Sequence, residues 1–239
     1  MNLFQLLSIL GIGLSVLVCL GHFVVIRPRR GAPALEPREL RRYGLWERLV
    51  HLVLVLSFLA LLVTSFGPAL RGIRMGGYGL MLHTAAGAAF AMSVAAMMIT
   101  WAVDACFAKH DHGWLRKCGC LGARVETLSI GRFDPAAKMY FWLAGLLALS
   151  TLLTMMLSMV PLFGTAGQWA LFHVHRYSAL VLVMATIVHM YRTTLGKPGG
   201  WGAMLSGRVS TAWAKHYHAL WAEEKTGTKF GLDKRKIDL

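Results

Sequence analysis

The chain contains five long apolar segments, and this feature constrains its fold more than any other. The segments cover residues 3–26, 49–66, 78–103, 140–160 and 169–191. Four of them approach or exceed the roughly 20 residues that a helix needs to cross a bilayer, and the second reaches that length when Leu45 and Trp46 extend it. Lipid offers no partner to a free backbone amide, so each segment must be a helix. The sequence therefore predicts an all-α integral membrane bundle with five spans.

The distribution of basic residues predicts the orientation of these spans. The formal net charge is +14, a value that would also suit a nucleic-acid-binding protein. Lys and Arg concentrate in 27–48, in 104–138 and after Tyr191, however, and not on one soluble face. Basic loops thus alternate with nearly uncharged ones, which is the positive-inside pattern. We expect the N-terminus outside, the C-terminus inside, contact of the basic segments with membrane lipid, and no nucleic-acid partner.

The first apolar segment resembles a retained helix more than a secretory signal. No Lys or Arg precedes it, whereas Arg27, Arg29 and Arg30 follow it. The sequence predicts four regions: an additional N-terminal transmembrane helix in 1–30, a cytoplasmic linker in 31–43, a four-helix core in 44–195, and a basic cytoplasmic tail in 196–239 that lies along the inner surface or docks a partner.

Histidines inside the predicted spans are the main functional signal, because ionisable residues are rare there. Those at membrane depth are His22, His51, His83, His173, His175 and His189. On the last helix, His175 and His189 are fourteen residues apart, which corresponds to about 21 Å of rise and about 40° of rotation. Both therefore face the same interior side, one near each membrane surface. His173 lies about 160° from His189, and we interpret it as an interfacial residue.

Chain topology provides each of these two histidines with a partner at matching depth. His51 opens the second span on the cytoplasmic side, where His189 closes the fifth, and His83 opens the third span on the outer side, level with His175. Two imidazoles at each of two levels are the ligand set of two b-type haems. Zinc fits less well because it gathers its ligands at one point. A single membrane histidine can also simply hydrogen-bond to a neighbouring helix.

Three further features leave alternatives open. Small residues in 84–89, beside His83, would let a flat macrocycle approach the backbone or would allow close helix packing. His22 has no partner in this scheme, so we interpret it as structural, with a quinone or lipid contact as the alternative. The 104–138 loop contains a group of residues that suits either free thiols or a zinc site: Cys106, His110, His112, Cys118 and Cys120.

Four motifs appear in an order and spacing that resemble a known family. "ERLVHLVLVLSFLALLVTS" contains Arg48 and His51, and "MLHTAAGAAF" contains His83 and Gly87. "HRYSALVLVMATIVHMY" begins with His175, and "GRVSTAWAKHYHALW" follows in the tail. Over 43–224 the chain resembles the cytochrome b (gamma) subunit of membrane-bound formate dehydrogenase, whose di-haem relatives serve hydrogenase and thiosulfate reductase.

The resemblance implies a four-helix di-haem cytochrome b core with the same two ligand pairs, in the bacterial inner membrane. It also implies that electrons enter from a periplasmic iron–sulfur or multihaem cytochrome subunit and leave to the quinone pool, menaquinone or ubiquinone, near the cytoplasmic face. The protein would then be the electron-transfer subunit of a quinone-linked oxidoreductase, with no substrate-oxidising centre of its own.

The quinone motif is the part of the family pattern from which this chain departs. The family has Lys-(Tyr/Phe)-Asn-Ala-Gly-Gln-Lys where this chain has "GRFDPAAK". Asp134 and Lys138 are therefore the candidate quinone residues. Asp134 is equally suited to cap the next helix ahead of Pro135, and Lys138 to snorkel at the interface.

Two other functions remain to be separated from this one. The first is a quinol-oxidising cytochrome b that donates electrons to a periplasmic multihaem cytochrome c or reductase. The second is a histidine-bearing transporter without haem, which predicts polar or acidic residues in the middle of the helices. The spans contain essentially none.

Overall fold

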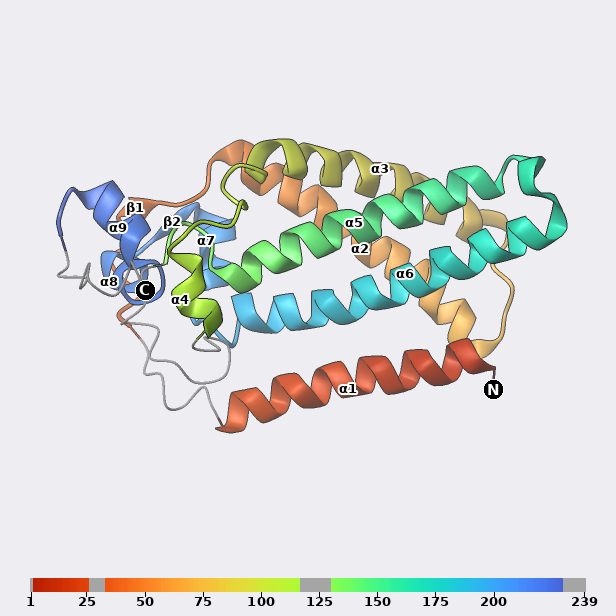
Figure 1. Cartoon of the computed structure of the whole chain (residues 1–239), viewed down its shortest axis with the longest axis horizontal. Coiled ribbons are helices and arrows are strands. Elements are labelled where there is room, and N and C mark those ends of the chain that lie inside the picture. Colours follow the sequence, from red (N-terminus) through yellow and green to blue (C-terminus); the bar gives the residue numbers. More distant parts are fainter. Residues whose placement is uncertain (1, 26–32, 117–129, 230–239) are drawn as a thin grey trace. The chain divides into compact units, whose positions relative to one another are not determined.

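The computed structural model describes residues 2–25, 33–116 and 130–229. Five of its helices are long and apolar enough to cross a membrane, which confirms the predicted number of spans (Figure 1). They are α1 (Leu3–Val25), α2 (Leu45–Arg71), α3 (Gly77–Trp101), α5 (Pro135–Ser158) and α6 (Gly164–Thr193). The helices α2, α5 and α6 begin before the predicted apolar segments, because a helical backbone continues into the interface, where side chains need not be apolar.

Shorter elements complete the described part of the chain. They are α4 (Asp111–Arg116), the 3-10 turn η3 (Pro161–Phe163), α7 (Gly200–Ser206), α8 (Thr211–Tyr217), α9 (Ala219–Thr226), and the strands β1 (Leu40–Arg41) and β2 (Arg208–Val209). The two strands pair antiparallel, with Leu40 opposite Val209. The all-α prediction holds apart from this two-residue ladder, which joins the predicted linker to the predicted tail.

The chain divides into two compact units. The first comprises the chain up to Val16, Leu49–Thr100 and Leu143–Ile187. Two buried clusters form its core, one of Phe4, Phe66, Leu180 and Val183, the other of Phe90, Ala148 and Leu182. The first cluster packs α1 against α2 and α6, so the additional N-terminal helix takes part in the core of this unit.

Large apolar side chains also lie on the outside of the long helices. Val63 on α2 is 71% exposed and Ile99 on α3 is 85% exposed. Contiguous exposed apolar surface of this extent is rare on water-soluble monomers, whereas it is the surface that hydrocarbon chains require. These faces are therefore the lipid-facing sides of the spans.

The second unit comprises Leu17–Arg48, Trp101–Trp142 and the chain from Val188 onward. Its buried core consists of Trp114, Ile130, Ala203, Val209, Trp213, Ala214, Tyr217, Trp221 and Ala222. The tail after α6 therefore packs into a folded core as well as carrying basic charge, which the sequence interpretation did not include.

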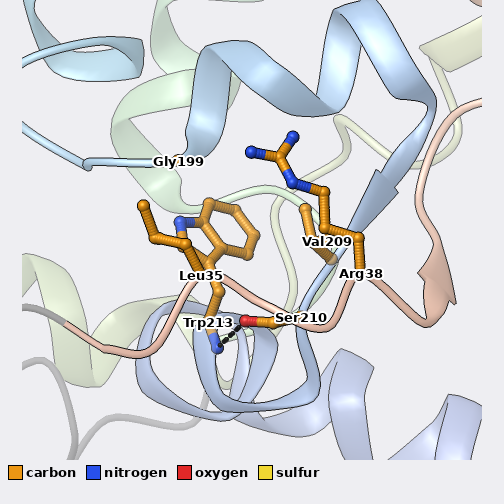
Figure 2. A pocket seen from close by; sticks show the side chains of 6 residues that line it. All are labelled: Leu35, Arg38, Gly199, Val209, Ser210 and Trp213. Carbon is orange, nitrogen blue, oxygen red and sulfur yellow. Dashed lines mark hydrogen bonds between the residues drawn. The ribbon is translucent and has the colours of Figure 1, made fainter.

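Figure 2 shows how tightly the linker packs against the tail in this unit. A small hollow with no room for a water molecule is lined by Leu35, Arg38, Gly199, Val209, Ser210 and Trp213. Ser210 caps α8 by accepting a hydrogen bond from the Trp213 backbone N–H at 3.0 Å. A Cβ at Gly199 would lie 2.6 Å from Leu35, and its φ of +89° also favours glycine. Ligand pockets usually enclose about 300–1,000 Å³, whereas this hollow does not hold even one water molecule, so it is a packing junction.

Candidate functional site

The rings of His83 on α3 and His175 on α6 lie next to each other in the first unit. Their ring centroids lie 6.5 Å apart and their planes are inclined by 68°. The structure thus brings together two of the four histidines that the sequence predicted as ligands, and they come from the two helices that helix geometry and chain topology had paired.

Each of these imidazoles is oriented by a threonine on a neighbouring helix. His175 Nδ1 donates to the Thr151 carbonyl oxygen on α5 at 2.9 Å. His83 Nδ1 lies 3.0 Å from Thr64 Oγ1 on α2, and because that hydroxyl donates to the Ala60 carbonyl at 2.7 Å, it accepts from the imidazole. Both rings then carry their proton on Nδ1, which leaves the Nε2 lone pair for a metal. Metal-binding histidines usually show this arrangement.

The separation of the two rings fits a metal held between them. Two metal–imidazole bonds of about 2 Å each, together with the offset of about 1.1 Å from each ring centroid to its nitrogen, give a centroid separation of about 6.3 Å. The observed value is 6.5 Å. A Cβ at Gly87, one turn after His83, would come no closer than 3.9 Å to Leu61. That distance is ordinary van der Waals contact, so Gly87 lets α3 pack closely against Leu61 on α2.

His51 and His189 are the second predicted pair. His51 is half-buried on α2 in the first unit, and His189 is half-buried on α6 in the second, so their pairing stays a prediction from helix geometry. α6 is a single helix from Gly164 to Thr193, and the calculation of rise and rotation from His175 to His189 applies along all of it.

The ring of Tyr140 stacks on the ring of His189. The centroids lie 4.0 Å apart and the planes are inclined by only 12°. Tyr140 belongs to α5, so this contact joins α5 to α6 in the second unit. The sequence interpretation did not single out Tyr140.

The remaining two histidines at membrane depth have partners of other kinds. His173 Nδ1 accepts from Arg176 Nη2 at 2.8 Å, so it is engaged separately from His175. The distance from Nδ1 of His22 on α1 to the hydroxyl oxygen of Tyr191 on α6 is 2.6 Å, which is a hydrogen bond. His22 therefore anchors the N-terminal helix, in line with the structural role expected for it.

Asp134 is buried at the start of α5 with both carboxylate oxygens engaged. Oδ1 accepts from the Ala137 backbone N–H at 2.8 Å and from Arg192 Nη2 at 3.1 Å, and Oδ2 accepts from Lys197. Pro135 occupies the first helical position, where its missing N–H costs no hydrogen bond. Asp134 thus caps α5 and ties it to the end of α6.

The charge state of Asp134 follows from its neighbours. Burial disfavours ionisation, but the cations of Lys197 and Arg192 outweigh that effect and hold the pKa of the Asp134 carboxyl well below its usual range. Asp134 is therefore a carboxylate at neutral pH, and it offers a ligand no proton and no unoccupied oxygen among the described contacts.

Lys138 is likewise engaged with protein groups. Its Nζ donates to Asp111 Oδ2 at 2.7 Å and to the Cys106 carbonyl at 2.8 Å, and its side chain is 4% exposed. A snorkelling lysine would reach solvent. Lys138, on α5, is instead buried in an ion pair with Asp111 on α4. A quinone held by Asp134 and Lys138 requires both sets of contacts to open, and this quinone site stays a prediction.

Two further polar networks in the second unit were not foreseen. Arg132 pairs with Glu47 and Asp104, each at 2.5 Å, and Trp101 Nε1–H donates to the same Glu47. His218 donates from Nδ1 to the Gly131 carbonyl at 2.8 Å and accepts from Arg42.

The structure describes only some of the residues on which the predictions for the cysteine-containing loop depend. Cys106 is an exposed free thiol, and among the described residues there is no group of three or more His, Cys, Asp and Glu that could hold a metal. Cys118 and Cys120 lie outside the described residues, so the choice between free thiols and a zinc site stays a prediction.

Comparison with known proteins identifies a family to which the chain is similar over most of its length. The model of the family described as prokaryotic cytochrome b561 matches residues 42–207, which include α2, α3, α5 and α6 but not α1. The chain is 26% identical over 195 residues to the formate dehydrogenase cytochrome b556(fdo) subunit of Escherichia coli K12, covering 77% of this chain and 92% of that subunit. It is 28% identical over 155 residues to the cytochrome b556(Fdn) subunit of the nitrate-inducible formate dehydrogenase of the same strain, covering 61% and 70%.

Proposed function

The chain belongs to the prokaryotic cytochrome b561 family, and from this premise we propose that it is a membrane electron-transfer subunit with two b-type haems. Membership of the family implies b-type haem and a multi-pass bacterial membrane protein. We assign one haem to His83 and His175 on the outer side. We assign the other to His51 and His189 on the cytoplasmic side.

The observation that carries the proposal is the arrangement of His83 and His175. Two imidazoles with Nδ1 fixed by protein oxygens, and with a ring separation suited to one iron, support bis-histidine ligation. Haem held in this way supplies one-electron transfer. The protein contributes the two ligands, fixes their tautomers through Thr64 and Thr151, and surrounds them with apolar helices.

Similarity to the two formate dehydrogenase cytochrome b556 subunits supports a place in a larger redox complex. We propose that a periplasmic iron–sulfur or multihaem cytochrome subunit exchanges electrons with the outer haem, and that the quinone pool exchanges them near the cytoplasmic face. The direction we favour is from the outer partner to quinone, as in formate oxidation. A quinol-oxidising cytochrome b that donates to a periplasmic reductase uses the same ligands in the reverse direction.

The position of the quinone is the least constrained part of this proposal. Asp134 and Lys138 mark the region by resemblance, yet each is engaged in buried ion pairs. Quinone binding there would displace Lys197 or Asp111 from its partner. A quinone-site inhibitor should slow electron exchange between the inner haem and quinone. Comparing the strength of this inhibition in the wild type and in D134N would test this location directly.

The decisive experiment is haem analysis of the purified full-length protein. We expect reduced-minus-oxidised bands of b-type haem and about two haems per chain by pyridine haemochrome. H83A and H175A should each lose the same haem, whereas H173A, the matched control two residues from His175, should keep both. A colourless wild-type protein would favour the transporter alternative, and full haem content in H175A would refute the assigned pair.

A further inference from the structure

We infer that Tyr140 is a positioning residue that sets the ring plane of His189, the ligand assigned to the inner haem. The inference rests on the proposed function, because it concerns how that ligand is presented to iron. It adds to the proposal a residue on α5 that contacts the ligand, which neither the motifs nor the resemblance indicated.

The geometry of the contact distinguishes it from ordinary aromatic packing. At 4.0 Å and 12°, the Tyr140 and His189 rings are in parallel face-to-face contact. Most other ring pairs in the described part of the chain are tilted or edge-on, as in the pair of His22 and Tyr191 at 5.5 Å and 77°. A parallel stack is lost when either ring rotates away, so the contact favours one rotamer of the histidine.

A stacked partner suits a metal ligand for a chemical reason. Imidazole binds a metal through a lone pair that lies in the plane of the ring, so a phenol ring on its face leaves that lone pair accessible. The same phenol ring blocks rotation of the imidazole about its bond to the side chain. Tyr140 therefore restricts the direction in which His189 presents its nitrogen.

The two helices that carry these rings are tied together close to the stack. Asp134, six residues before Tyr140, pairs with Arg192, three residues after His189, at 3.1 Å. Trp142, two residues after Tyr140, donates from Nε1 to the Ala105 carbonyl at 3.0 Å. The ion pair joins the start of α5 to the end of α6, and the Trp142 hydrogen bond anchors α5 next to Tyr140 to the segment that follows α3.

Tyr140 lies in the second unit with His189, whereas His83 and His175 lie in the first unit. The Nδ1–H groups of His83 and His175 donate to threonine oxygens, and the face of the His189 ring is in contact with Tyr140. Substitutions at Tyr140 should act on the inner haem alone, which provides an internal reference in every measurement.

The test compares Y140L, which removes the aromatic ring, with Y140F, which keeps it. The matched control is F141L, because Phe141 contacts Trp142 edge-on and belongs to the same turn of α5. The full-length proteins are purified, and haem per chain, the midpoint potential of each haem and the EPR spectrum of the oxidised state are recorded. Loss of a group that orients a ligand commonly weakens metal affinity by about 10- to 100-fold.

We expect Y140L to lose haem toward one per chain, or to shift the inner potential and EPR signal while the outer haem stays unchanged. Y140F and F141L should match the wild type. Unchanged inner-haem properties in Y140L would overturn the inference, as would loss of both haems from Y140L, because that result indicates a general folding defect. A wild-type protein with no haem, or with a single haem that H189A retains, would instead overturn the proposed function.

Discussion

The imidazoles of His83 and His175 lie next to each other with a centroid distance of 6.5 Å, and their planes are inclined by 68°. Each ring is fixed by a threonine from another helix, so the pair is oriented by four helices of the first unit. If these histidines hold haem as proposed, this restraint would set both the affinity for iron and the spectroscopic character of the haem.

The hydrogen bond from His83 to Thr64 should tune the outer haem. T64V removes the acceptor, so the imidazole becomes less electron-rich, and we expect the outer midpoint potential to rise and haem affinity to fall by about 10- to 100-fold. T64S keeps a hydroxyl and should retain the wild-type potential. Redox titration of both variants checks this, and an unchanged potential in T64V would show that the hydrogen bond has no influence on the iron.

The inclination of the two ring planes predicts an EPR signature. Strongly twisted axial imidazoles bring two iron d orbitals close in energy, so the oxidised low-spin haem should give a highly anisotropic signal. The signal is best recorded on H189A, in which the outer haem remains. A rhombic signal of the kind that parallel imidazoles produce would contradict the 68° arrangement.

The hydrogen bond between His22 and Tyr191 should couple α1 to α6. Comparable side-chain hydrogen bonds between membrane helices contribute about 0.6 kcal/mol on average. A double-mutant cycle with H22F and Y191F, measured by unfolding in mixed detergent, should give a coupling energy of about that size. Strictly additive effects of the two substitutions would mean that the contact does not stabilise the folded protein.

The ion pairs of Asp134 should be a major stabilising contact of the second unit. D134A leaves Arg192 and Lys197 without their buried partner, which typically costs about 3–5 kcal/mol. D134N keeps a side-chain oxygen for the Ala137 N–H, and should recover the cap but not the ion pairs. Thermal unfolding of both variants separates these contributions; equal stability of D134A and wild type would contradict the burial of the charges.

Acid should loosen the second unit through His218. Burial and the nearby Arg42 guanidinium hold the pKa of the His218 imidazole well below its usual range, and the neutral tautomer is the one that its two contacts require. The unfolded state binds a proton below about pH 6.5, while the folded state does not, so stability falls as the pH decreases from that value toward the folded pKa. Asp134, whose pKa is also depressed, adds a second loss below about pH 3.9.

Limited proteolysis of the tail as a function of pH checks this expectation. Cleavage after α7 should accelerate below about pH 6.5 in the wild type and should depend less on pH in H218Q, whose side chain does not titrate. Equal pH dependence of the two proteins would assign the acid sensitivity to other groups.

The periodicity of the sequence determined which features were predictable. His175 and His189 could be placed on one side of a helix because rotation per residue is nearly constant within a helix. Their contacts with Thr151 and Tyr140 depend on the register and rotation of α5 relative to α6, which no single helix encodes. The capping role of Asp134 was foreseen as an alternative because it depends only on local chain geometry, whereas its ion pairs come from residues far along the chain.

The tail also shows that the sequence predicts which side of a segment is apolar but not which residues pack against it. Trp213, Tyr217 and Trp221 recur at intervals of four, which indicates a common apolar side, and all three are buried in the second unit. The basic charge of the segment suggested surface contact with lipid, and composition alone gave no sign of the partners that cover these rings. Those partners include Trp114 on α4 and Ile130, which belong to the chain segment between α3 and α5.

The apolar cluster around Leu182 has an electrical consequence. Leu182 lies seven residues from both His175 and His189 on α6, and it is buried with Phe90 and Ala148. Packed hydrocarbon has a low dielectric constant. The cluster of Phe90, Ala148 and Leu182 therefore forms a region of low dielectric constant at the level on α6 midway between His175 and His189. Moving one electron through the full membrane field changes its energy by about 2.3 kcal/mol per 100 mV. In the proposed two-haem arrangement, the membrane voltage would therefore act directly on electron transfer between the haems, slowing it in one direction and assisting it in the other.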